Sequence, residues 1–169
     1  MSKFRSIIMR SNRLLGAALV EKNLVTVEQL ESATERLLQV IDNGTDREAC
    51  LLAILIHETK AFAEETLLEQ LVDESQLALI DLREVDVNDD LKLSLNPGPC
   101  WASWTVPFDK DEDVHYLATA YYPSMAVRQY WEKELGEPII WYACTLESIA
   151  EFLEKLEAER AGLNAQAAG

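Results

Sequence analysis

The chain of 169 residues has no long apolar run. Its first apolar stretch, Leu14 to Val20, is followed at once by Glu21 and Lys22, whereas a membrane-spanning helix needs about 20 apolar residues. No small-residue cleavage site follows this stretch, so a secretory signal peptide is not expected. The sequence therefore predicts a cytoplasmic protein with no direct membrane insertion.

Cysteine and histidine are also scarce. The three cysteines, Cys50, Cys100 and Cys144, lie far apart and are odd in number, which indicates reduced, buried thiols rather than a disulfide framework. The two histidines, His57 and His115, have no partners at the spacing of metal ligands. We therefore expect no metal site.

Known catalytic motifs are missing as well. The six glycines are scattered and none precedes a lysine, so the chain lacks the G-x-x-x-x-G-K-S/T loop that binds nucleotide phosphates. It also lacks the G-x-S-x-G motif that presents a nucleophilic serine. The sequence predicts no catalytic residue, no cofactor and no enzymatic activity.

The formal net charge of −15 is unevenly distributed. Residues 1–20 carry four cations and no acid, so the rest of the chain carries −19. An acidic body repels phosphate backbones, so nucleic acid is not expected as a partner. The basic N-terminal segment could bind the acidic body, an acidic partner or an anionic ligand, or it could be a solvated arm. It also carries apolar side chains, and its candidate partner-binding residues are Lys3, Phe4, Arg5, Ile7, Ile8 and Arg10.

Periodicity predicts an α+β fold, with an N-terminal all-α helical lobe followed by a small, sandwich-like α+β lobe. Apolar residues recur at helical spacing up to about Glu74, which predicts a helical lobe over residues 1–75. From Gln76 the chain changes to short apolar stretches separated by turn residues, which predicts the α+β lobe over 76–160. The Ala- and Gly-rich tail, 161–169, is expected to be flexible. The helices of the first lobe are predicted at 14–22, 27–41, 47–58 and 64–73.

In the second lobe, the pattern predicts a hairpin of strands 101–108 and 114–121, preceded by a loop at 96–99. Trp101 and Trp104 would then face opposite sides of a strand, which leaves one of them as a candidate for an exposed interaction surface. A helix over 124–135 that leads to a strand at 139–143 predicts a β-α-β crossover and a parallel strand pair. Thr145 is expected to cap a final helix that ends at Glu157.

The most informative segment is Leu15 to Leu30. Leu15 and Leu19 share one face of a helix, Asn23 tolerates a left-handed cap, and Thr26 with Gln29 forms the S/T-x-x-E/Q capping box of a second helix. The segment resembles the repeat that opens the N-terminal domain of the assembly ATPases of bacterial type II secretion and type IV pilus systems. The matching positions are Leu15, Gly16, Leu19, Val20, Val25, Thr26 and Leu30.

This likeness extends over about residues 13–157, and Leu55, Ile56, Phe62 and Leu67 fit a degenerate second copy of the repeat. It implies a non-catalytic docking or regulatory domain without the motor. The implied partner is a protein, the cytoplasmic domain of an inner-membrane platform protein, so the chain would be peripheral to that membrane through its partner.

The same resemblance implies an alternative function, because some members of the family bind cyclic di-GMP (c-di-GMP) through the repeat. In this reading the ligand-binding residues are Arg13, Leu15, Gly16, Leu19 and Asn23. The docking hypothesis places the N-terminal segment outside the core. Removal of residues 1–11 is therefore expected to leave the fold intact.

Overall fold

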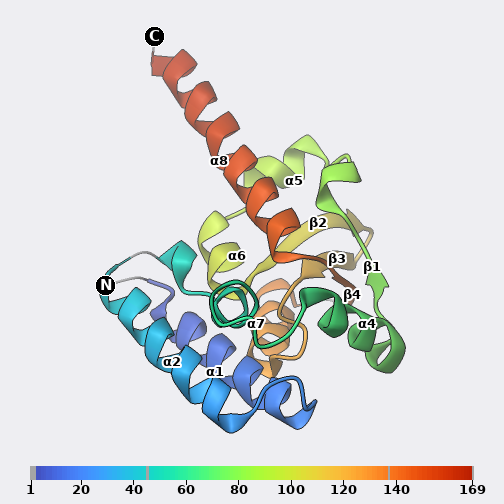
Figure 1. The fold of residues 1–169 in the computed structure, drawn as a ribbon. Helices are drawn as coiled ribbons and strands as arrows, with labels where there is room; N and C mark the ends of the chain where they lie inside the picture. Colours follow the sequence, from blue (N-terminus) through green and yellow to red (C-terminus); the bar gives the residue numbers. More distant parts are fainter. Residues whose placement is uncertain (1–2, 45, 137, 169) are drawn as a thin grey trace.

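The structure is a computed structural model that describes residues 3–44, 46–136 and 138–168. Helices come first along the chain, and the strands follow from Ala78 onward (Figure 1). The first part comprises α1 (Arg5–Glu21), α2 (Val27–Asp42), η1 (Asp46–Glu48), α3 (Leu51–Ala53), η2 (Ile54–Glu58) and α4 (Glu64–Ser75). The second comprises β1 (Ala78–Leu79), η3 (Leu82–Glu84), α5 (Asp89–Ser94), α6 (Pro97–Ser103), β2 (Thr105–Asp111), β3 (Val114–Thr119), α7 (Met125–Leu135), β4 (Ile139–Ala143) and α8 (Leu146–Ala168).

Helix α1 begins at Arg5, well before the predicted start at Leu14. Its buried stripe includes Ser11 and Asn12, two polar residues that apolar periodicity does not count. The Ser11 hydroxyl donates to the Ala102 carbonyl oxygen at 3.2 Å, and the Asn12 amide donates to the Ile8 carbonyl oxygen at 2.8 Å. Because these hydrogen bonds satisfy the buried polar groups, the helix continues through them into the core.

The turn between α1 and α2 has the predicted geometry. Asn23 adopts the left-handed conformation, with φ of 60°, and the Leu24 amide donates to the Leu19 carbonyl oxygen at 3.0 Å. Thr26 caps α2 through a capping box with Gln29. The helix-turn-helix prediction for this segment is therefore confirmed.

The predicted helix over 47–58 is instead three short segments, η1, α3 and the π-helical η2. The backbone at Cys50 is extended, and its sulfur accepts a hydrogen bond from the Ala53 amide at 3.4 Å. The Leu51 amide donates to the Asn12 side-chain oxygen at 3.0 Å. The region is bound to side chains of distant elements, so helix propensity alone does not decide its form.

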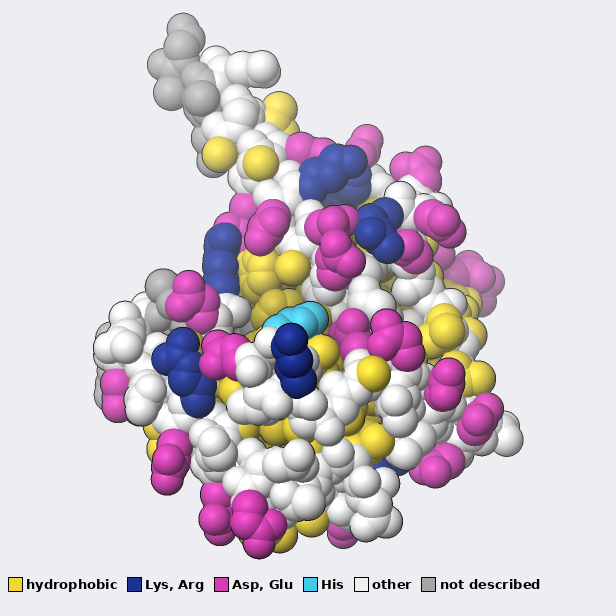
Figure 2. Space-filling view, in the orientation of Figure 1, with side chains coloured by type: hydrophobic (Ala, Val, Ile, Leu, Met, Phe, Trp, Pro, Cys, Tyr) yellow, Lys and Arg dark blue, Asp and Glu magenta, His cyan; other side chains and the backbone are white. Residues whose placement is uncertain are grey.

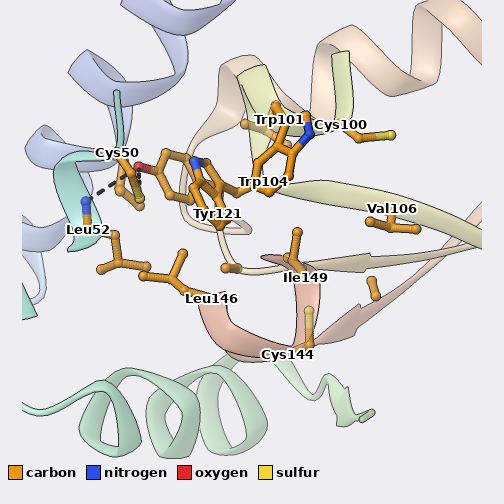
Figure 3. Close-up of a cluster of buried hydrophobic side chains, with 14 of the residues drawn as sticks. Cys50, Leu52, Cys100, Trp101, Trp104, Val106, Tyr121, Cys144, Leu146 and Ile149 are labelled. Carbon is orange, nitrogen blue, oxygen red and sulfur yellow. Dashed lines mark hydrogen bonds between the residues drawn. The ribbon is translucent and has the colours of Figure 1, made fainter. Parts of the chain in front are cut away.

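The sheet has the order β1-β4-β3-β2. Strands β2 and β3 form the predicted antiparallel hairpin, with a bulge between Pro107 and Asp109, and β3 pairs in parallel with β4 across the α7 crossover, also as predicted. Pro107 lines a cavity with Trp131 of α7, so α7 covers that face of the sheet. Val106 points to the opposite face, where Figure 3 shows it in one buried cluster with Ile149 of α8. The sheet is thus sandwiched between helices.

Two details of the second part differ from the prediction. Asn96 caps α6 through its side chain and Pro97 occupies the first turn, so residues 96–99 start a helix rather than form a loop. Trp101 therefore lies on a helix, and Trp104 lies in the left-handed turn that ends it, with φ of 48°. Their rings make an edge contact at 5.5 Å, and both side chains are buried. The expectation that one of them is exposed is wrong.

Helix α8 continues past the predicted end at Glu157 to Ala168, so the described part of the 161–169 segment is helical. Good helix formers dominate this stretch, which favours continuation over a break at Gly162. Arg160 anchors the helix to the end of α5, because its guanidinium donates to the carbonyl oxygens of Leu93 at 3.3 Å and Leu95 at 2.7 Å. The last turns stand out from the body (Figure 1).

One apolar cluster connects both parts of the chain. It contains residues of α1, α3 and α4 together with residues of the sheet, α6 and α8. The boundary between lobes at about residue 75 stays a prediction, although the described residues before Leu77 contain no strand. The α+β class is confirmed. Among the described residues, no helix is both long enough and apolar enough to cross a membrane.

Candidate functional site

A groove of about 380 Å³ separates the exposed edges of α1 and α2. We call it the α1–α2 groove. Its floor is apolar, and its walls include Met9 on α1 and Leu38 on α2, which are 37% and 42% exposed. The residues that line it are Met9, Arg10, Asn12, Arg13, Leu30, Thr34, Leu37, Leu38 and Leu51.

Gly16 sets how closely the two helices approach each other below the groove. A Cβ atom at this position would lie 2.7 Å from Leu30 Cδ1 and 3.2 Å from Leu51 Cδ2. A side chain at this position would force Leu30 to move, because such contacts are shorter than van der Waals separations. The glycine of the repeat therefore has a packing role here.

The groove carries two cations. Arg10 and Arg13 are one turn apart on α1, and both are exposed. Neither makes an ion pair with a described residue, whereas Lys22, Arg36, Arg47 and Arg83 each pair with an acid. On the face in Figure 2, acidic side chains are spread widely and basic ones are fewer. Arg10 and Arg13 therefore give this groove a positive charge on a protein whose net charge is negative.

The residues proposed for partner binding do not line one cavity. Arg10 lines the α1–α2 groove, while Lys3 and Phe4 line a different cavity of about 520 Å³ beside α7. Ile7 and Ile8 are 8% and 2% exposed and belong to the core. Their assignment to a binding surface is wrong, because α1 starts early enough to turn both side chains inward. Arg5 is exposed at the start of α1.

The residues proposed for c-di-GMP are also separated. Arg13 lines the α1–α2 groove, but Leu15 and Leu19 are fully buried in the core and cannot contact a ligand. Gly16 is covered by Leu30, and Asn23 is exposed in the turn, outside the groove lining. Of the five residues, the groove contains only the arginine.

Sequence reasoning missed the α2 wall and Met9. The adjacent leucines Leu37 and Leu38 are the signal in the sequence that indicates the α2 wall. A helix buries two adjacent leucines only if its apolar face is unusually wide, so one of them is expected at the surface. Leu37 is buried, and Leu38 is left at the groove edge.

The strongly perturbed titratable groups lie away from the groove. Burial raises the pKa of the Cys50 thiol to about 12, although the Tyr121 hydroxyl, 3.3 Å from the sulfur, acts against this. Burial also raises the pKa of the Glu64 carboxyl, which accepts a hydrogen bond from the Leu146 amide at 3.0 Å. The described residues contain no group of three His, Cys, Asp or Glu side chains that could hold a metal ion.

No protein-family model matches the sequence, and no curated protein matches it. Solved structures do match. A structure of MshE with cdg has a TM-score of 0.53 and 20% identity, with 84% of this chain and 97% of that chain covered. The N-terminal domain of XpsE has a TM-score of 0.53 and 17% identity, with 82% of this chain and 90% of that chain covered. A second crystal form of the XpsE domain has a TM-score of 0.51 and 15% identity, with 85% of this chain and 94% of that chain covered.

The chain has the fold of the N-terminal domains of secretion and pilus ATPases. XpsE and MshE belong to the class of protein that the Leu15–Leu30 pattern resembles, so this recognition is confirmed at the level of the fold. The matches cover most of this chain and nearly all of each neighbour.

Proposed function

We propose that the chain is a non-catalytic docking domain that binds a protein partner through the basic residues of α1 and of the segment just before it. The observation that carries this proposal is the exposure of Lys3, Arg5, Arg10 and Arg13 on or beside one rigid helix of a protein with a formal net charge of −15. A fixed basic surface attracts an acidic partner and orients it before contact. The fold, which is that of the N-terminal domains of XpsE and MshE, supports the same role.

The partner that fits this fold is the cytoplasmic domain of an inner-membrane platform protein. Binding to such a partner would hold the chain at the membrane surface without a segment of its own in the bilayer. The partner should present acidic side chains, since like charges across an interface are unfavourable.

The test measures binding of this chain to the platform protein's cytoplasmic domain by isothermal titration and stopped-flow mixing. Reversing three cations (Lys3→Glu, Arg5→Glu, Arg10→Glu) should weaken binding by about tenfold or more and slow association. A control with the same change in net charge reverses Lys60, Lys133 and Lys155, which are exposed elsewhere. Equal losses in both triple variants would show that total charge, not the α1 surface, controls binding.

A second candidate function is the binding of c-di-GMP, favoured by Arg13 in the groove and by the similarity to MshE, which was solved with cdg. Burial of Leu15 and Leu19 and the covering of Gly16 remove the contacts that the repeat would supply. Each lost contact costs about 1–3 kcal/mol, so titration with c-di-GMP should give no affinity tighter than about 10 µM. Submicromolar binding that Arg13→Ala abolishes would make this the leading function.

A further inference from the structure

The α1–α2 groove brings two exposed apolar side chains, Met9 and Leu38, together with Arg10 and Arg13, which make no ion pair with a described residue. From this we infer that it binds one acidic amphipathic helix of the protein partner. The inference rests on the proposed docking function and adds the site and the chemistry of what the site holds.

The dimensions of the groove suit a helix. Its α2 wall extends from Leu30 to Leu38, and at about 1.5 Å per residue this is roughly 12 Å, or a little more than two helical turns. An amphipathic helix places apolar side chains at i, i+3 or i+4, and i+7, so two or three of them can reach the floor. The floor consists of Leu30, Leu37 and Leu51.

The exposed apolar side chains give a reason for the groove to be covered. Met9 and Leu38 stand on opposite walls and are each more than a third exposed. A methionine adapts its shape to a partner because it is unbranched and polarisable, which suits a contact made by a second helix. Burial of these two side chains would contribute to affinity. Both already lie at the groove, so binding requires no rearrangement of the helices.

The charges decide the chemistry of the bound helix. Arg10 and Arg13 occupy the α1 wall and have no acidic partner among the described residues. Glu31 and Glu35 are exposed on α2, two turns and one turn before Leu38. The bound helix should therefore carry Asp or Glu on the flank that faces α1 and no acid on the flank that faces α2. This asymmetry also fixes its rotation in the groove.

The experiment uses a displayed library of amphipathic helices of about 16 residues, with a constant apolar face and polar flanks that are acidic, basic or neutral. Selection on the full chain should enrich helices with one acidic flank over basic ones by about tenfold or more. The best helix, made as a fluorescent peptide, is then measured by anisotropy. Enrichment of basic or neutral flanks, or no enrichment, would overturn the inference.

Variants then locate the bound peptide. Arg10→Glu with Arg13→Glu should weaken binding by about 30-fold, and Leu38→Ser by about tenfold. Lys133→Glu and Val72→Ser are the matched controls, because Lys133 is exposed on α7 outside the groove lining and Val72 is 37% exposed on α4. All four variants should unfold at the same temperature as the parent, since they change exposed side chains. Equal effects of the groove and control variants would contradict the assignment.

Two other anionic probes separate this inference from its alternatives. Vesicles of phosphatidylcholine with phosphatidylserine, and c-di-GMP, should not displace the peptide. If either one binds and Arg10→Glu with Arg13→Glu abolishes that binding while acidic helices fail to bind, the groove recognises phosphate and the inference is wrong. If the platform domain still binds but no helix is selected, the docking function stands and only the groove assignment fails.

Discussion

The hydroxyl of Tyr121 donates a hydrogen bond of 2.7 Å to the side-chain oxygen of Asn12, and so joins the loop after β3 to the middle of α1. Both residues are fully buried. The same hydroxyl accepts a hydrogen bond from the Leu52 amide at 3.4 Å and lies 3.3 Å from the Cys50 sulfur (Figure 3). Three segments that are far apart in the sequence therefore meet at one polar point inside an apolar core.

Replacement of Tyr121 by Phe should lower the free energy of unfolding by about 1–2 kcal/mol, because the Asn12 oxygen loses a donor and the Leu52 amide is left buried without its acceptor. Urea denaturation measures the change. Tyr142→Phe is the control and should shift the midpoint little, since Tyr142 is partly exposed and its hydroxyl makes no hydrogen bond with the described residues. A loss of stability no greater than that of Tyr142→Phe would mean that the buried network contributes nothing.

The packing role of Gly16 gives a second prediction. Gly16→Val should destabilise the domain by about 2–3 kcal/mol, because even one added carbon would meet Leu30 at 2.7 Å. Gly162→Val is the matched control, as that position on α8 is exposed and has no atom within 4 Å of an added Cβ. Thermal unfolding of both variants decides the matter. A stable Gly16→Val variant would show that the Leu30 side chain or α2 can move aside without cost.

The sequence could predict the secondary-structure elements that are determined by residues close together in the chain. Thr26 and Gln29 cap α2 by themselves, Asn23 can adopt a positive φ, and the order of strand, helix and strand implies the parallel pair of β3 and β4. The repeat pattern at Leu15–Leu30 also led to the correct fold, because the spacing of its apolar residues records how two helices pack.

The sequence could not predict features that depend on distant partners. Ser11 and Asn12 look like surface residues until Ala102 and Ala49 are placed beside them, so apolar periodicity starts α1 too late. The sequence shows Arg10 and Arg13 only as cations of a basic segment, and the arrangement of α1 against α2 is needed to see that they share a groove. The sequence pattern places Trp101 in a strand, because the cap at Asn96 lies within a sequence typical of a loop.

The early start of α1 reverses the expectation for the N-terminal deletion. Removal of residues 1–11 takes away Ile7 and Ile8, which are buried in the core, and the Ser11 hydrogen bond to Ala102. Loss of two buried isoleucines costs about 4 kcal/mol or more, a large part of the stability of a domain of this size. The truncated chain should therefore be unfolded or strongly destabilised, as far-UV circular dichroism would show. A deletion variant with the same melting temperature as the parent would show that residues 1–11 are not part of the core.

Glu64 links the start of α4 to the start of α8, and this contact should make stability depend on pH. Burial is the main reason that the pKa of its carboxyl lies above the ordinary value of 4.5, and Glu65 and Glu147 add to the rise. The hydrogen bond from the Leu146 amide and the attraction of His57 act in the opposite direction but are outweighed. The folded state therefore holds this proton at pH values where the unfolded state has released it.

An acid whose pKa is higher in the folded state contributes less to stability as the pH rises through the window that starts at about 4.5. Glu64→Gln keeps an oxygen that can accept from the Leu146 amide but has no proton to lose. Relative to this variant, the parent should lose free energy of unfolding between pH 4.5 and neutrality, and urea midpoints across this range measure the difference. Glu65→Gln, which removes an exposed carboxylate next to Glu64, should follow the pH profile of the parent far more closely. If the parent instead gains stability over Glu64→Gln as the pH rises, the hydrogen bond to Leu146 outweighs burial and the assigned direction of the pKa change is wrong.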